Sequence, residues 1–174
     1  GFGISVSDDG HYLVLSVWKG TDDRYRIVVF DLTKPSAAPL ELIDNFDFEY
    51  TFVGNDESVL YFQTNRDAPR RRVIAIDVLH SKEANWKEII PQTENTLTSV
   101  DIVGDHFLAS YLQDAKTLVR QYQLDGTHVR DVDLPGIGAA RGFSGDRDHD
   151  ETFYSFSSFA IPPSTYRYDI ASGE

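Results

Sequence analysis

One acidic run has the composition of a cation site. Residues 146–151 read Asp-Arg-Asp-His-Asp-Glu, and carboxylate oxygens at alternating positions suit a hard cation such as Ca²⁺. The run lacks the glycine-centred loop of twelve residues that an EF-hand uses. Since clusters of charged loop residues are usually solvated, we predict an exposed turn here and no metal site.

A basic run offers a second kind of chemistry. Arg70, Arg71 and Arg72 are consecutive, and guanidinium groups can clamp phosphate or carboxylate groups with two hydrogen bonds each. The run lies in a connection between two predicted strands of an acidic protein. We therefore predict ion pairs with neighbouring acids, with contacts to a partner domain as the alternative.

Nucleophilic catalysis by a serine is the third kind of chemistry to consider. The nearest match to the Gly-x-Ser-x-Gly elbow is Gly-Phe-Ser-Gly at 142–145, where the second glycine comes one position early and no helix follows. Serine, histidine and aspartate occur elsewhere, but a triad is a geometry and not a composition. The chain has no cysteine, so thiolate chemistry is absent. We predict a turn at 142–145 and no hydrolysis by this chain alone.

The elements that must position these residues recur at a fixed spacing of 46 residues. One predicted strand has copies at 29–32, 75–78, 121–124 and 167–170. The same shift superposes an upstream strand at 13–18, 59–64, 105–110 and 151–156. These segments are rich in Val, Leu, Phe and Tyr, which favour strands packed on both faces. A period in this range indicates a repeat protein.

Two further strands complete each repeat. The long polar connections of the hairpins are predicted at 19–26, 65–72, 111–118 and 157–164. Weaker strands follow at 40–46, 86–91 and 128–134, and then at 49–53, 97–103 and 137–143. Four strands per repeat is the count of a propeller blade, whereas other repeats of this length require helices. The one helical alternative is a turn or two within 81–86.

The sequence therefore predicts an all-β fold: a β-propeller segment of about four blades, each a four-stranded antiparallel sheet. We treat 1–174 as one partial propeller domain with approximate blades at 1–46, 47–93, 94–136 and 137–174. The chain has no methionine, and its last repeat ends after the third strand. We expect a fragment of a larger propeller, or one that borrows a strand. Exposed strand edges would then favour self-association.

Aspartates recur at one place in the repeat. Asp31, Asp77 and Asp169 each end a strand, where a carboxylate can accept hydrogen bonds from backbone N–H groups of the following turn. Gln123 occupies that position in the third repeat and could bond similarly through its amide. We predict structural roles for all four.

Composition narrows the functional classes. Hydrophobic residues make up 41% and aromatic residues 13%, which is enough for a packed core. The formal net charge of −12 argues against nucleic-acid binding, which depends on neutralising phosphates. No apolar run is long enough to span a membrane and no signal peptide is recognisable. The absence of cysteine is compatible with cytoplasm or periplasm; we favour the cytoplasm.

Several stretches together resemble the prolyl oligopeptidase family. They follow one order along the chain: Ser-Asp-Asp-Gly-His-Tyr-Leu at 7–13, Leu-Ile-Asp-Asn-Phe at 42–46, Thr-Asn-Arg at 64–66 with Pro69, Gly-Phe-Ser-Gly at 142–145, and Phe-Tyr-Ser-Phe-Ser-Ser-Phe at 153–159 with Pro162, Pro163 and Tyr-Arg-Tyr-Asp at 166–169. The resemblance covers essentially the whole chain and falls on the family's non-catalytic propeller of seven blades.

The resemblance implies a division of labour. In that family the propeller lies as a lid over an α/β-hydrolase domain, which carries the catalytic Ser, Asp and His and cleaves after proline. The enclosed cavity admits short peptides and excludes folded proteins. The implied partners are a peptide substrate and the hydrolase domain, and no cofactor or metal is needed.

The resemblance also implies candidate site residues. Trp18, Lys19 and Thr21 lie where the family's matching hairpin faces the hydrolase and lines the outer substrate cavity. The resemblance carries over the position but not the chemistry, because the mammalian enzymes of the family resemble this chain with an arginine in place of Trp18 and a cysteine in place of Thr21. An indole could stack on a peptide or a proline ring. Packing within the blade is the alternative for Trp18.

Two functions remain open at this point. The first is the gating, substrate-selecting part of a serine peptidase of this family. The second is a separate propeller module that binds a protein or a small ligand through the loops on one face. A hydrolase domain encoded after residue 174 would distinguish the first from the second.

Overall fold

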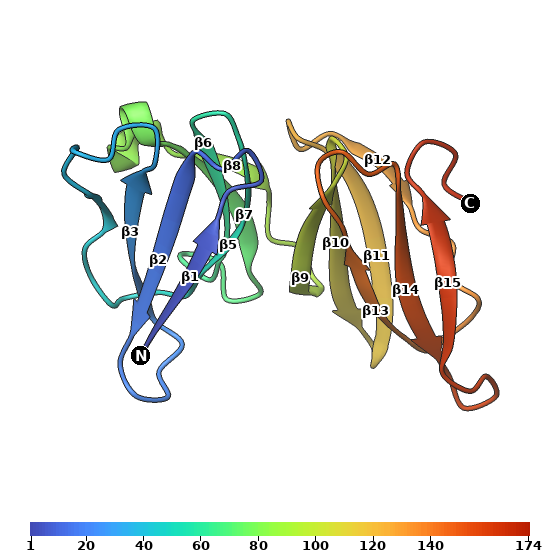
Figure 1. The fold of residues 1–174 in the computed structure, drawn as a ribbon. Coiled ribbons are helices and arrows are strands. Elements are labelled where there is room, and N and C mark those ends of the chain that lie inside the picture. Colours follow the sequence, from blue (N-terminus) through green and yellow to red (C-terminus); the bar gives the residue numbers. More distant parts are fainter. The chain divides into compact units, whose positions relative to one another are not determined.

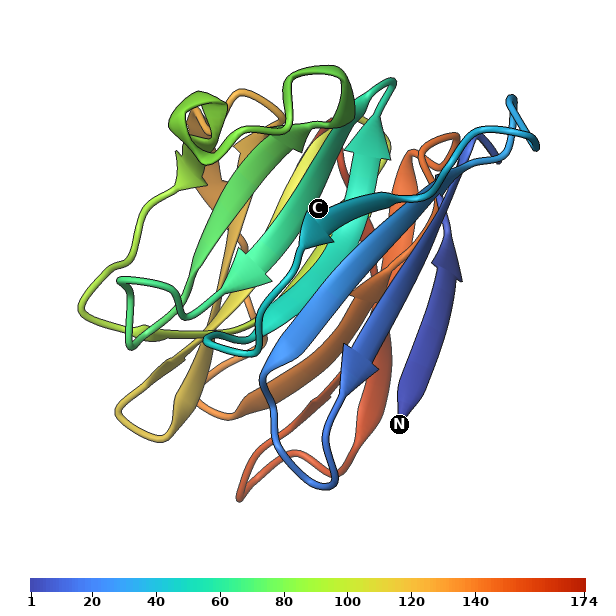
Figure 2. The same ribbon diagram turned by 90° about the vertical axis from the view of Figure 1, so that its left-hand side faces the viewer.

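The computed structural model describes all residues from Gly1 to Glu174, and its regular elements are β-strands and two short 3-10 turns. The chain divides into two compact units, Gly1–Pro91 and Gln92–Glu174. Each unit contains two antiparallel sheets whose strands follow one another in chain order (Figures 1 and 2). No helix is long and apolar enough to cross a membrane. The all-β prediction with four antiparallel sheets is confirmed.

The first unit holds two four-stranded sheets. The first sheet contains β1 (Phe2–Val6), β2 (Tyr12–Trp18), β3 (Tyr25–Asp31) and β4 (Leu40–Ile43), in that order. The second contains β5 (Tyr50–Asp56), β6 (Val59–Thr64), β7 (Arg72–Asp77) and β8 (Lys87–Ile90). Between β7 and β8 lie the 3-10 turns Val78–His80 and Glu83–Asn85, so the helical alternative for 81–86 is realised as a single short turn.

The second unit holds a four-stranded and a three-stranded sheet. The first contains β9 (Thr96–Val103), β10 (His106–Gln113), β11 (Lys116–Gln123) and β12 (His128–Asp131). The other contains β13 (Ala139–Ser144), β14 (Glu151–Ser157) and β15 (Ser164–Asp169). Within this unit the β10–β11 and β14–β15 hairpins lie at the same end of their sheets (Figure 1).

One predicted hairpin loop is wrong. The segment 111–118 was expected to be a long polar connection, but β10 and β11 pair as far as Gln113 opposite Lys116. Asp114 and Ala115 alone make the turn, both with left-handed φ angles of 45° and 63°. A two-residue turn with positive φ matches the twist of the paired strands, and Asp tolerates that conformation. The connections after β2, β6 and β14 are longer, as predicted.

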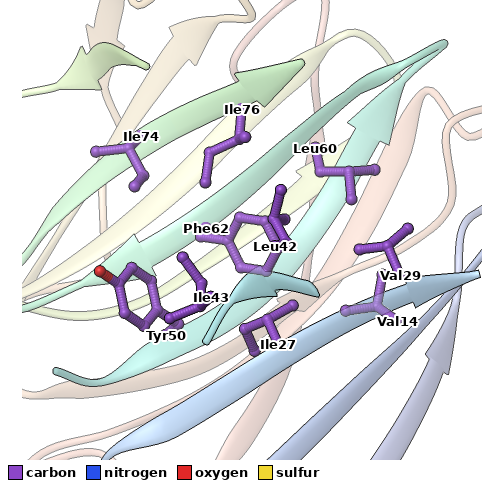
Figure 3. Packing of buried hydrophobic residues seen from close by; sticks show 10 residues of the cluster. All are labelled: Val14, Ile27, Val29, Leu42, Ile43, Tyr50, Leu60, Phe62, Ile74 and Ile76. Atoms are coloured by element: carbon purple, nitrogen blue, oxygen red, sulfur yellow. The ribbon is translucent and has the colours of Figure 1, made fainter. Parts of the chain in front are cut away.

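The core of the first unit lies between its two sheets. Alternate residues of each strand point to the same face, so Ile27 and Val29 of β3 meet residues of the other sheet such as Leu60 and Phe62 of β6 (Figure 3). Five of the six residues of β6 are buried, so this strand is covered on both of its faces. Continuous burial explains why its sequence shows no apolar and polar alternation.

The second unit repeats this arrangement with more aromatic residues. Leu108 and Val119 of its first sheet pack with Phe143 and Phe156 of the other. The rings of Phe143 and Tyr154 stack with centroids 4.5 Å apart and planes 10° from parallel. Tyr154 and Phe156 of β14 therefore belong to this core, whereas Phe153 is 55% exposed.

Strand-end aspartates close the turns that follow them. Asp31, Asp77 and Asp169 accept hydrogen bonds from the backbone N–H groups two or three residues later, at 2.9, 3.0 and 2.7 Å. Their predicted structural role is confirmed. The Gln123 amide does not make the equivalent bond. In the turn after β11 the backbone N–H of Thr127 donates instead to the carboxylate of Asp125, two residues after Gln123, at 2.8 Å.

Polar bonds of side chains join the sheets of each unit. In the first unit the Asn55 amide donates to the Asp9 carboxylate at 2.8 Å. In the second, the fully buried Gln121 amide donates to the carbonyl of Ile170 at 2.9 Å and accepts from the Tyr168 hydroxyl at 2.7 Å. Such bonds fix the relative register of two sheets, since a shift would leave buried polar groups unsatisfied.

The Gln121 bridge gives a test of this packing. Gln121→Leu keeps the approximate volume but leaves the Ile170 carbonyl and the Tyr168 hydroxyl without partners in the core. We expect the free energy of unfolding in urea to fall by about 2 to 4 kcal/mol. The matched control is Gln123→Leu on the same strand, where the side chain is exposed and the change should stay within about 0.5 kcal/mol. Equal losses in both variants would contradict a structural role for the bridge.

Candidate functional site

The β2–β3 hairpin carries the three candidate site residues. Trp18 ends β2 and pairs across the hairpin with Tyr25, which begins β3. Residues 19–24 form the connection, with Lys19 and Thr21 exposed. The sheet therefore fixes Trp18 and leaves the two other candidates on the loop, at the end of the sheet opposite the β3–β4 connection (Figure 1).

The connection is ordered by its own hydrogen bonds. The N–H of Asp22 donates to the Lys19 carbonyl at 3.0 Å, and Gly20 has a left-handed φ of 59° that favours glycine. The Asp22 carboxylate accepts from the backbone N–H of Arg24 at 3.0 Å and from its Nε at 2.8 Å. These bonds from Arg24 lower the pKa of Asp22 to about 2. The loop is thus a formed structure with a local ion pair.

The candidates have different surroundings. The Trp18 indole is half-buried and meets Tyr25 edge to face, with ring centroids 5.9 Å apart. A Cβ added to Gly3 would lie 3.4 Å from this indole, so the ring rests against β1 where that strand has a glycine. Lys19 Nζ lies 4.3 Å from the centre of the Phe46 ring, a cation–π distance. Trp18 therefore has packing contacts within its own sheet, whereas Lys19 and Thr21 are both exposed.

The acidic run is an exposed turn, as predicted. Asp146, Asp148 and His149 are exposed, and their nearest potential ligand atoms lie within 4.8 Å of one another. His149 Nδ1 accepts from the backbone N–H of Asp146 at 3.2 Å, while the Arg147 guanidinium pairs with Asp105 at 2.6 Å. The run stabilises the turn before β14 and offers a cation no buried ligand.

The basic run makes ion pairs, as predicted. Arg71 Nε lies 2.9 Å from a carboxylate oxygen of Glu49, and Arg72 Nη1 lies 2.8 Å from Glu88. Glu88 lies on β8, the strand next to that of Arg72, so this pair crosses between adjacent strands. The contacts with these acids account for the two arginines without a bound phosphate.

No nucleophile elbow is present at 142–145. Ser144 is the last residue of β13, and a turn leads from it to β14. Phe143 is fully buried and has a φ of 67°, because the strand bulges at this point against β14. The predicted turn at 142–145 is wrong for residues 142–144, which belong to the bulged end of β13; the connection to β14 begins at Gly145.

A second set of serine, aspartate and histidine is also structural. The Ser7 hydroxyl donates to the Asp9 carboxylate at 2.6 Å and accepts from the backbone N–H of Tyr12 at 2.9 Å. His11 Nδ1 lies 3.4 Å from the same carboxylate. In a catalytic triad the serine would bond to the imidazole, whereas here it bonds to the carboxylate. These residues close the β1–β2 turn.

Asp101 is a perturbed carboxylate that the sequence reasoning missed. It lies on β9 opposite Leu108, between the buried Val100 and Ile102. Removal from water raises its pKa to about 6. A strongly shifted carboxyl group is a candidate functional group in any fold. The available signal was one acid flanked on both sides by β-branched apolar residues, Val100 and Ile102, within a predicted strand.

Asp101 makes stability depend on pH. An unfolded aspartate has a pKa near 3.9, so between about pH 4 and pH 6 the folded state binds more protons and stability falls as pH rises. We expect Asp101→Asn to be more stable than the parent by about 1 to 2 kcal/mol at pH 7 and equal to it near pH 4. Urea unfolding at both values measures this. Asp133→Asn, an exposed position in the same unit, is the control, and identical pH profiles for the two variants would contradict the assignment.

Comparison with known proteins identifies the architecture. A family described as "Prolyl oligopeptidase, N-terminal beta-propeller domain" matches residues 1–174. The chain is 33% identical to the prolyl endopeptidase of Elizabethkingia meningoseptica over 171 residues, covering 98% of the chain and 24% of that protein. It is 32% identical to the prolyl endopeptidase of Dictyostelium discoideum over 189 residues, covering 99% of the chain and 25% of that protein.

Solved structures agree with the sequence relatives. A structure from a study of two prolyl endopeptidases superposes with a TM-score of 0.91 at 32% identity, covering 99% of this chain and 25% of that one. Prolyl oligopeptidase B from Galerina marginata, bound to a 35mer substrate, superposes with a TM-score of 0.88 at 26% identity, covering 99% and 25%. The chain thus spans about a quarter of the length of the relatives it matches. It belongs to the prolyl oligopeptidase family and is a segment of that family's N-terminal β-propeller domain.

Proposed function

We propose that this chain is the non-catalytic, gating part of a serine peptidase that cleaves short peptides after proline. The hydrolysis itself would take place on an α/β-hydrolase domain in the rest of the protein. The observation that carries the proposal is the match of the entire chain to a propeller domain whose curated relatives are prolyl endopeptidases about four times as long.

The structure supports a role in selection by size. Each unit consists of antiparallel sheets packed around a cluster of buried hydrophobic residues, and close-packed interiors deform little. Loops at one end of such sheets, including the ordered connection at 19–24, can restrict an opening without making a chemical bond to substrate. Selection by exclusion requires no cofactor and no metal ion.

The β2–β3 hairpin is the part we assign to the substrate side. Thr21 is exposed at the loop, Lys19 presents an ammonium group above Phe46, and Trp18 lies half-buried at the base. A peptide passing this loop would meet a cation and a partly open aromatic surface. The partners we propose are a short peptide and the hydrolase domain, in the cytoplasm; the net charge of −12 disfavours nucleic acid.

Gating can be tested by narrowing the passage at Thr21. In the full-length protein, Thr21→Cys is prepared in a background without other accessible cysteines and modified with a bulky maleimide. Hydrolysis is measured for proline-containing peptides of about 5, 15 and 30 residues. We expect kcat/KM to fall at least about tenfold for the longest peptide and by less than about twofold for the shortest, because a steric barrier penalises larger substrates.

The matched control is Ser36→Cys carrying the same label. Ser36 is exposed in the β3–β4 connection, at the opposite end of the same sheet. Its modification should leave all three peptides unaffected. If the label at Thr21 is equally without effect on every peptide, the gating role of this hairpin is wrong.

Isolated from the rest of the protein, the chain should self-associate through exposed strand edges. β1 is the edge of the first sheet, and its Phe2, Ile4 and Val6 are 69%, 58% and 53% exposed. An unpaired apolar edge favours strand pairing between copies, and a charge blunts it. We expect concentration-dependent dimers of the 174-residue chain in light scattering, reduced by Ile4→Lys. A parent chain that stays monomeric at high concentration would contradict this.

A further inference from the structure

A groove in the second sheet has no role in the function proposed above. Its volume is about 620 Å³, within the range of about 300 to 1,000 Å³ that small-molecule sites occupy. Val59, Tyr61 and Ala75, from β6 and β7, form its apolar wall. The segment between β7 and β8 and the start of β8 supply the rest. The groove therefore lies wholly within the first unit.

The rim of the groove is held by hydrogen bonds from side chains to the backbone. Asp77 accepts from the N–H of Leu79 at 3.0 Å and caps the first 3-10 turn. The Asn85 amide donates to the carbonyl of His80 at 3.2 Å. Trp86 Nε1 donates to the carbonyl of Ser81 at 2.9 Å. Three bonds across ten residues give a preformed rim, which reduces the conformational entropy lost when a ligand binds.

The Trp86 indole is fixed from its other side as well. Its ring meets Tyr50 edge to face with centroids 6.5 Å apart, and the Arg66 guanidinium lies 5.3 Å from it. Trp86 also packs against the core of the first unit, so these contacts hold its ring in one orientation at the groove. Together with Tyr61 and Ile89, Trp86 makes the groove suited to a ligand with an apolar body.

The charges at the groove favour a carboxylate on that ligand. Lys87 lines the groove, is exposed, and has no carboxylate within 4.0 Å, so its ammonium group is available. Asp77 also lines the groove, and its carboxylate bonds to His80 Nδ1 at 2.8 Å. Of the other nearby acids, Glu83 pairs with Arg66 and Glu88 pairs with Arg72. An anion at Lys87 therefore gains an ion pair without displacing one.

We propose that this groove binds a small organic carboxylate with an aromatic or aliphatic body, its apolar part against Trp86 and Tyr61 and its carboxylate at Lys87. The site is independent of the peptidase role, since it lies at the β7–β8 connection and uses no residue of the β2–β3 hairpin. A failure of gating would leave it unaffected.

The test uses fluorine NMR of the full-length protein grown with 5-fluorotryptophan. The Trp86 resonance is assigned by its loss in Trp86→Phe, and Trp18, which does not line the groove, is the internal reference. Phenylacetate is titrated as the probe, with neutral phenylacetamide and cationic phenethylamine as matched compounds. We expect phenylacetate to shift the Trp86 signal saturably at millimolar concentration, to leave the Trp18 signal unchanged, and to bind more tightly than the other two.

A pair of lysine variants tests the carboxylate contact. Lys87→Gln should weaken phenylacetate binding about threefold to fivefold, the effect of one partly exposed ion pair, and should leave phenylacetamide binding unchanged. Lys82→Gln removes the same charge from an exposed residue that does not line the groove and should have no effect. The proposal is overturned if the Trp86 signal does not saturate, if phenethylamine binds as well as phenylacetate, or if the two lysine variants behave alike.

Discussion

Burial of apolar surface between the two sheets of each unit is the constraint on which the rest of the structure depends. A four-stranded sheet of Val, Leu, Ile and Phe is stable in water only when neighbouring sheets or other groups cover it. In the first unit Ile27 and Val29 meet residues such as Leu60 and Phe62, and the second unit repeats the pattern with Leu108, Val119 and aromatic residues. The strand pattern recurs along the chain because each repeat builds a similar sheet that must pack against a neighbouring sheet.

Polar bonds between the sheets fix their register and also add to stability. Gln121 and Tyr168 bond across two sheets, and Asn55 and Asp9 do so in the first unit. A sliding motion of one sheet would cost little apolar contact but would leave these groups unsatisfied. The same logic at strand ends explains Asp31, Asp77 and Asp169, whose carboxylates satisfy turn N–H groups. The connections between strands differ in sequence from one repeat to the next. The β2–β3 loop exposes Lys19 and Thr21, whereas the β7–β8 segment forms part of a groove.

Prediction from sequence succeeded where local spacing carries the signal. The strand 59–64 and the strand-end aspartates could be predicted because period and residue type determine them. Ion pairing of Arg71 and Arg72 could be predicted from the acidic composition, but their partners Glu49 and Glu88 are set by strand pairing. The loop at 111–118 could not, because Asp114 and Ala115 take left-handed angles that neither residue signals as glycine would. The position of Trp18 at the end of β2 was predicted, but its contact with Tyr25 and with β1 depends on strand pairing.

The sequence by itself determined the strand content, the four-strand repeat and the family, since alternation, composition and ordered motifs are properties of neighbouring residues. The tertiary structure alone decided which polar groups lose their contact with water. Asp101 becomes a perturbed acid because a folded strand places it between buried residues, and the groove at Trp86 and Lys87 exists because a short segment folds over a sheet. Desolvation and enclosure depend on atoms distant in the chain, so no local pattern specifies them.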